Sequence, residues 1–149
     1  MPSAESTTHL RSIVVPVDGS DASIQAVALA CDIARKNKGK VYALHVIEVK
    51  RTLPLDAPLQ PEEDAGERIL AEAEQVARKQ GFDIESEILH AREAGPAIVD
   101  DAIERRADLI ILGIPYEQVF GDFELGRVPQ YVLRSAPCEV WLCRHPVRA

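Results

Sequence analysis

The sequence is poor in the residues on which several protein classes depend. Among its 149 residues are three cysteines, and aromatic residues make up 5%, too few rings for stacking on single-stranded nucleic acid. No apolar run approaches the roughly 18–20 residues of a membrane span, and the polar start lacks the apolar stretch of a secretory signal. With 24 Asp+Glu against 17 Lys+Arg, the net charge is −7, which argues against nucleic acid or an anionic membrane as a partner. The composition predicts a soluble, cytoplasmic protein.

The length of the chain favours one domain that buries a core without disulfides or metals. We expect a flexible N-terminal tail over residues 1–10 and a single α/β domain over residues 11–145.

The cysteines and histidines form no recognisable reactive set. Cys31 falls on the apolar side of an expected helix, and Cys138 and Cys143 are five residues apart at a strand, so they point to opposite faces. We interpret all three as small buried hydrophobic residues. The four histidines have no metal-ligand spacing, and no GxSxG motif is present. The sequence therefore predicts neither a metal site nor catalytic residues.

Apolar segments alternate in type along the chain. Continuous apolar runs predict strands at residues 13–17, 41–46 and 109–112, and an alternating pattern predicts an edge strand at 82–89. Residues 139–143 are expected to form the final strand. Apolar stripes predict helices after Ser20, at 62–80, from Gly95 onward and at about 128–135. Residues 50–61 read as a long proline-rich loop, and residues 113–126 as irregular. The order β-α-β-α-β-α-β-α-β predicts a doubly wound, mostly parallel sheet with helices on both faces.

In such sheets ligands bind outside the carboxyl ends of the strands. Four segments at these positions, VVPVDGSDAS, LHVIE, DLIILG and APCEVWL, occur in order between about residues 11 and 144. This ordered set resembles the universal stress protein family. The resemblance implies a five-stranded parallel sheet of order 3-2-1-4-5, a dimer formed through the final strand, and an ATP-binding pattern G-2x-G-9x-G-[ST] after the fourth strand.

The phosphate half of that pattern is degenerate in this chain. Gly113 and Gly126 match its first and third glycines, but Tyr116 and Arg127 stand at the second glycine and at the Ser/Thr. Tyr116 fills space that glycine leaves open, and Pro129 offers no N–H to a phosphate. Three carboxylates in this segment repel a triphosphate, namely those of Glu117, Asp122 and Glu124. Arg127 either pairs with one of these carboxylates or contacts phosphate.

The adenosine half is better matched. The resemblance places Asp18 where it accepts a hydrogen bond from adenine or ribose, while its alternative role is a helix cap or turn. The neighbouring positions of the site are Pro16, Val17, Val46, Leu112 and Val128. His45 is interpreted as a packed strand residue rather than a catalyst.

The leading hypothesis is a non-enzymatic stress-response module. It is a homodimer joined between Glu139 and Arg144, with a modified site for an adenine nucleotide (ATP or AMP) and weak or absent ATP binding. Two alternatives stay open. One is an ATP-binding switch in which Arg127 replaces the Ser/Thr and any hydrolysis is slow. The other is an enzyme on the same scaffold, such as an adenylyl-transferring or flavin-type domain.

Overall fold

A computed structural model of the chain describes residues 8–115, 118–119, 122–123 and 125–145. The elements, in chain order, are β1 (Ser12–Pro16), α1 (Asp21–Asn37), β2 (Lys40–Glu48), α2 (Gln60–Lys79), β3 (Glu85–Ala91), α3 (Ala94–Glu104), β4 (Leu109–Gly113), β5 (Gln118–Val119), β6 (Asp122–Phe123), α4 (Arg127–Ser135) and β7 (Glu139–Cys143).

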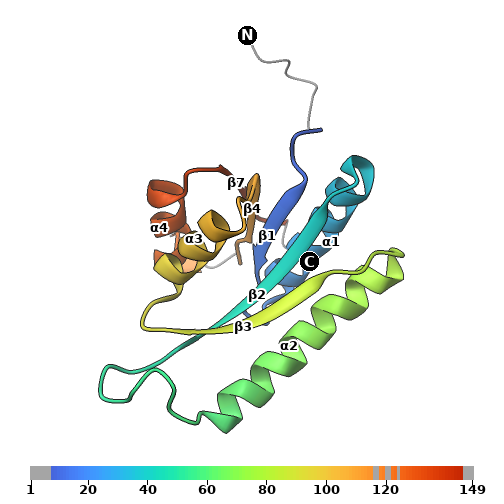
Figure 1. Cartoon of the computed structure of the whole chain (residues 1–149). Coiled ribbons are helices and arrows are strands. Elements are labelled where there is room, and N and C mark those ends of the chain that lie inside the picture. The colour runs from blue at the N-terminus through green and yellow to red at the C-terminus, as the bar shows by residue number, and fades with distance from the viewer. Residues whose placement is uncertain (1–7, 116–117, 120–121, 124, 146–149) are drawn as a thin grey trace.

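The main sheet has five parallel strands in the order β3-β2-β1-β4-β7. Because β7 is the fifth strand of this sheet along the chain, the expected order 3-2-1-4-5 is confirmed. In Figure 1 helices α1 and α2 lie on one side of the sheet, and α3 and α4 lie on the other. The doubly wound α/β architecture is therefore confirmed as well.

Two hydrophobic clusters fill the space between the sheet and its helices. Ile13 and Val15 of β1 belong to the cluster under α1 and α2, whereas Val14 belongs to the cluster under α3 and α4. All three side chains are fully buried, which explains the continuous apolar run of this strand. Leu10, the last residue of the expected tail, is also fully buried.

Cys31 is buried as expected, whereas Cys138 and Cys143 are only partly buried, because β7 lies at the edge of the sheet. Cys31 is buried in the first cluster, and burial raises the pKa of its thiol to about 11. Cys138 packs on the α3/α4 side and Cys143 on the α1/α2 side, and neither forms a disulfide. Their opposite orientation is confirmed.

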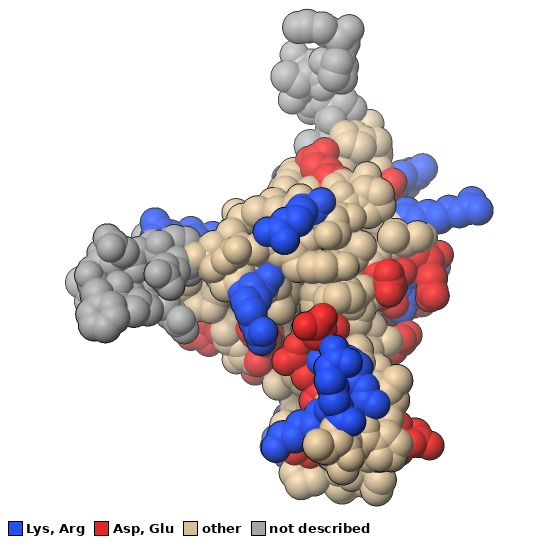
Figure 2. Space-filling view, turned by 90° about the vertical axis from the view of Figure 1, so that its left-hand side faces the viewer, with Lys and Arg blue, Asp and Glu red and all other residues tan. Residues whose placement is uncertain are grey.

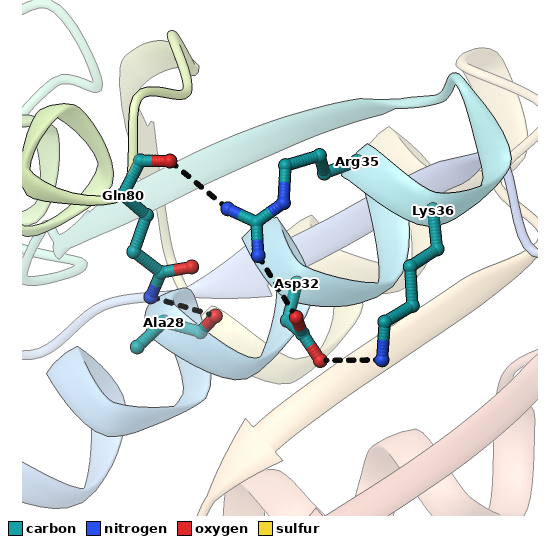
Figure 3. Close-up of polar contacts among 5 residues, drawn as sticks. All are labelled: Ala28, Asp32, Arg35, Lys36 and Gln80. Carbon is teal, nitrogen blue, oxygen red and sulfur yellow. Dashed lines mark hydrogen bonds and ion pairs between the residues drawn. The ribbon is translucent and has the colours of Figure 1, made fainter.

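Polar contacts join the carboxyl ends of α1 and α2 (Figure 3). Arg35 Nη1 donates to the carbonyl of Gln80 at 2.9 Å, and Gln80 Nε2 donates to the carbonyl of Ala28 at 3.2 Å. Asp32 accepts from both Arg35 and Lys36. The two bonds of Gln80 join the helices on one face of the sheet, whereas those of Asp32 lie within α1 and orient Arg35.

Two expectations about the elements were wrong. The stretch after β4, expected to be irregular, contains the antiparallel pair β5–β6, in which Gln118 pairs with Phe123. Strand β3 begins at Glu85 rather than at Phe82, because the backbone at Phe82 donates to the carbonyl of Ala77 and completes the end of α2.

Candidate functional site

A pocket of about 350 Å³ opens at the carboxyl ends of β1 and β4, beside the start of α4. The strand order reverses at this point, since β1 has β2 on one side and β4 on the other. This is where doubly wound sheets bind their ligands. We call this cavity the main pocket.

The structure brings nine of the ten sequence-predicted site residues together in the wall of the main pocket. They are Pro16, Val17, Asp18, Val46, Leu112, Gly113, Gly126, Arg127 and Val128. The tenth, Tyr116, lies outside the described residues. Three segments far apart in sequence thus meet at one cavity.

Asp18 lines the main pocket and also closes the turn that begins α1. Its Oδ1 accepts from the Ser20 N–H at 2.9 Å and from the Ser20 hydroxyl at 2.6 Å. Ser20 Oγ in turn accepts from the Ser23 N–H and caps the helix. Partial burial acts to raise the pKa of Asp18, but the hydrogen bonds of Ser20 and Ser23 outweigh it and lower that pKa. The carboxylate is therefore ionised at neutral pH, and both hydrogen bonds from Ser20 are accepted by Oδ1.

The structure requires glycine at only one of the two motif positions, Gly113 and Gly126. A Cβ at Gly113 would lie 2.0 Å from the carbonyl oxygen of Ala22, so glycine is required there by the close approach of β4 and α1. A Cβ at Gly126 would meet nothing closer than Pro129 Cδ at 3.8 Å. Packing therefore demands glycine at Gly113 and leaves Gly126 without such a constraint.

The amino end of α4 faces the main pocket with uncapped backbone. Gly126 is its N-cap and supplies no side-chain cap, and Arg127 and Val128 follow as the first two helical residues. Their N–H groups are available to an anion, whereas Pro129 has none. Of the carboxylates expected to oppose phosphate, Glu117 and Glu124 lie outside the described residues, and Asp122 is placed by its backbone in β6.

His45 lines the main pocket in addition to packing in the sheet. Its Nδ1 lies 2.8 Å from the carbonyl oxygen of Val17, and because a carbonyl oxygen only accepts, Nδ1 carries the hydrogen. A Cβ at Gly66 of α2 would lie 2.7 Å from His45 Cδ2. The interpretation as a packed residue agrees with this geometry. A glycine within a helix was the signal in the sequence for its close contact.

Sequence reasoning missed other residues of the wall. The hydroxyl of Ser23 accepts from the Asp18 N–H at 3.4 Å and lies in the pocket wall. The remaining additions are apolar, namely Leu44, Ala94 and Ile98, while Ile114 and Pro115 belong to a segment that the sequence already places at a strand end. Their roles depend on packing between distant elements, which no local motif encodes.

The described residues contain no group of three or more His, Cys, Asp or Glu side chains that could hold a metal ion. A search of the same residues finds no helix with the length and apolar character needed to cross a membrane.

The fold and the pocket define a doubly wound α/β protein with a cavity at its topological switch point. The universal stress protein family matches residues 9–144. A universal stress protein of Methanocaldococcus jannaschii is 31% identical over 142 residues, which cover 91% of this chain and 83% of that protein. The chain belongs to the universal stress protein family.

Solved structures of the family have the same fold. A universal stress protein from Archaeoglobus fulgidus aligns with a TM-score of 0.74 and 26% identity, over 89% of this chain and 97% of that one. A structure of the universal stress protein from Archaeoglobus fulgidus in complex with dAMP aligns with a TM-score of 0.70 and 25% identity, over 89% and 96%.

Proposed function

We propose that this chain is a non-enzymatic, cytoplasmic regulatory module of the stress response that binds an adenine nucleoside or its monophosphate in the main pocket. ATP binds weakly or not at all. The observation that carries the proposal is the convergence of Asp18, the apolar strand ends and the uncapped start of α4 on one cavity of about 350 Å³.

The adenosine part of the ligand fits the strand side of the cavity. Pro16, Val17 and Val46 supply an apolar wall for a base, and the ionised Asp18 has an unused oxygen that accepts from a ribose hydroxyl or an amino group. The structure of the family member with dAMP supports this ligand class.

The phosphate part has limited support. The N–H groups of Arg127 and Val128 and the positive end of the α4 dipole favour one phosphate. Further phosphates lack the Ser/Thr of the family pattern, because Arg127 stands in its place, and Pro129 removes the next donor. These groups therefore suit the α-phosphate and no further phosphate.

One observation favours a second candidate, an ATP-binding switch. Arg127 lines the main pocket, and a guanidinium binds phosphate oxygens with two parallel hydrogen bonds. An enzyme on this scaffold is disfavoured because Ser23 and His45, which both line the cavity, bond to the backbone carbonyls of Ser20 and Val17 and not to each other. Release of ADP or pyrophosphate from ATP, or a coloured flavin in the purified protein, would identify an enzyme.

Calorimetry with AMP on two Asp18 variants tests the proposal. Asp18→Ala should bind AMP ten- to a hundredfold more weakly, since a hydrogen bond to a carboxylate contributes about 1.5–3 kcal/mol. Asp18→Asn keeps the oxygen that Ser20 needs for the turn and should also lose affinity, because an NH₂ group replaces Oδ2. Asp18 should matter more than any residue between 113 and 127.

Asp21→Ala is the matched control, because Asp21 lies in the first turn of α1 and outside the wall of the main pocket. Its affinity for AMP should be that of the wild type. Mass spectrometry of small molecules released from gently purified protein complements the titration. Unchanged AMP affinity in a folded Asp18→Ala variant would move the site elsewhere.

A further inference from the structure

A second, polar groove adjoins the main pocket and carries a separate set of charged residues. This side groove has a volume of about 270 Å³. It shares Ala94, Arg127 and Val128 with the main pocket, so the two cavities meet at the start of α4. A ligand bound in one can therefore extend past Arg127 into the other.

Two arginines of α4 line the side groove. Arg127 and Arg134 are seven residues apart, which places them on the same face of the helix and about 10 Å apart along its axis. Neither guanidinium forms an ion pair with a described residue, whereas Arg35, Arg78 and Arg105 each do. The two guanidiniums are positioned to bind anionic groups.

Two carboxylates oppose them. Glu48 at the end of β2 and Glu93 just before α3 line the same groove. Glu48 Oε2 accepts from the Ala94 N–H at 2.9 Å, while Glu93 makes no side-chain cap to α3. Figure 2, which views the side of the molecule where α3 and α4 lie, shows basic and acidic side chains next to one another on this face. A bare chain of phosphates is repelled by such carboxylates, whereas sugar hydroxyls donate hydrogen bonds to them.

Tyr131 lines the side groove and packs against the start of α3. A Cβ at Gly95 would lie 2.9 Å from Tyr131 Cδ1, so glycine allows the ring to lie directly against α3. The ring is half-buried and presents an apolar surface between the two arginines, of the kind on which sugar and base rings pack.

We propose that the side groove binds the second sugar of an adenine nucleotide whose diphosphate carries one, with ADP-ribose as the simplest example. The inference rests on the proposed function, because the adenosine part occupies the main pocket. Arg127 and Arg134 bind the diphosphate, and Glu48 and Glu93 accept from the hydroxyls of the second ribose. Because the carboxylates accept from the sugar and repel a free terminal phosphate, we expect a sugar-capped diphosphate to bind more tightly than ADP or ATP.

Calorimetric titration of ADP-ribose, ADP and AMP tests the inference, since ADP-ribose and ADP differ only by the second sugar. The wild type should bind ADP-ribose at least tenfold more tightly than ADP. In Glu93→Ala this advantage should fall below threefold, whereas Arg134→Gln should weaken ADP and ADP-ribose alike, because both ligands carry the diphosphate. AMP affinity should be unchanged in both variants, because neither residue lines the main pocket. Arg78→Gln, an exposed arginine of α2 outside both cavities, is the control.

The outcomes separate this inference from the proposed function. Equal affinities for ADP-ribose and ADP, with AMP bound as expected, would overturn the sugar site and leave the AMP site standing. A full advantage retained in Glu93→Ala, or unchanged affinity of Arg134→Gln for both diphosphates, would also overturn it. Absence of binding by all three ligands would refute the proposed function and this inference together.

Discussion

At the scale of single residues, Asp18 serves the fold and the pocket with different oxygens. Oδ1 accepts both hydrogen bonds from Ser20 and stabilises the start of α1, and we expect Oδ2 to contact the ligand. The two roles that the sequence offered as alternatives, turn residue and ligand contact, are therefore compatible. The turn is observed, and the ligand contact stays a prediction.

The two glycines of the degenerate motif should respond differently to a methyl group. Gly113→Ala forces a Cβ against the backbone of Ala22, so we expect a loss of about 1–3 kcal/mol or more in the free energy of unfolding. In Gly126→Ala the Cβ fits, and the loss should stay near or below about 1 kcal/mol. Urea denaturation measures both. Equal losses would show that the spacing of β4 and α1 does not determine the glycine.

The sequence could identify Gly113 and Gly126 as the two glycines of the motif, but it could not show which of them is required by packing. Gly113, at the end of β4, is constrained by Ala22 of α1, which lies far earlier in the chain. His45 and Gly66 are a similar case, since their contact is set by the packing of α2 on β2. Local patterns place residues at strand ends, while contacts between elements decide which of those residues are structural.

At the scale of elements, the positions of the main strands and helices could be predicted because burial on both faces leaves continuous apolar runs. Strand β4 follows such a run, and all four residues Leu109 to Leu112 are buried. The pair β5–β6 could not be predicted, because strands of two residues are too short to show a period. Its position between β4 and α4 matters, since that connection carries the degenerate motif.

Helix α3 is tied to the sheet by Arg105 at its carboxyl end. Arg105 Nε donates to Asp101 at 2.7 Å and Nη2 to Glu87 of β3 at 3.0 Å, while the guanidinium lies 4.3 Å from the ring centre of Tyr42. Partial burial acts to lower the pKa of Arg105, but these carboxylates outweigh it and raise that pKa. The arginine is thus charged in the folded protein and compensates the buried Asp101.

Removing this arginine should destabilise the fold. Arg105→Met leaves the Asp101 side chain, which is 9% exposed, without its cation, and we expect a loss of about 2–4 kcal/mol in urea denaturation. Arg78→Met is the matched control, because its pair with Glu74 is 64% and 33% exposed and should contribute less than about 0.5 kcal/mol. Similar small losses in both variants would contradict the role of Arg105.

At the scale of the whole molecule, β7 is an edge of the sheet with apolar side chains. Leu142 is 37% exposed, and Val140 and Trp141 are half-buried against the two clusters of their own chain. Trp141 Nε1 donates to Glu139 at 2.6 Å. Open apolar edges are usually covered in proteins, so we expect a homodimer through the segment from Glu139 to Arg144.

Sedimentation tests the dimer. A charge at Val140 or at Leu142, as in Leu142→Glu, should dissociate the protein with its fold retained, because the carboxylate would be buried at the interface. Leu55→Glu, at an exposed leucine in the loop between β2 and α2, should remain dimeric. A wild-type protein that is monomeric at tens of micromolar would contradict the expected homodimer.

We expect the main pocket to recognise adenosine better than it recognises polyphosphate. Titration of ATP, ADP, AMP and adenosine at fixed magnesium and salt measures this directly. ATP should bind no more tightly than AMP or adenosine, because Pro129 and the substituted Ser/Thr position leave few backbone and hydroxyl donors for additional phosphates. In addition, Glu48 and Glu93 in the adjoining side groove repel the free phosphates. ATP bound tenfold or more tightly than AMP, a difference of about 1.4 kcal/mol, would contradict the account, and loss of that preference in Arg127→Ala would assign the phosphate contact to Arg127.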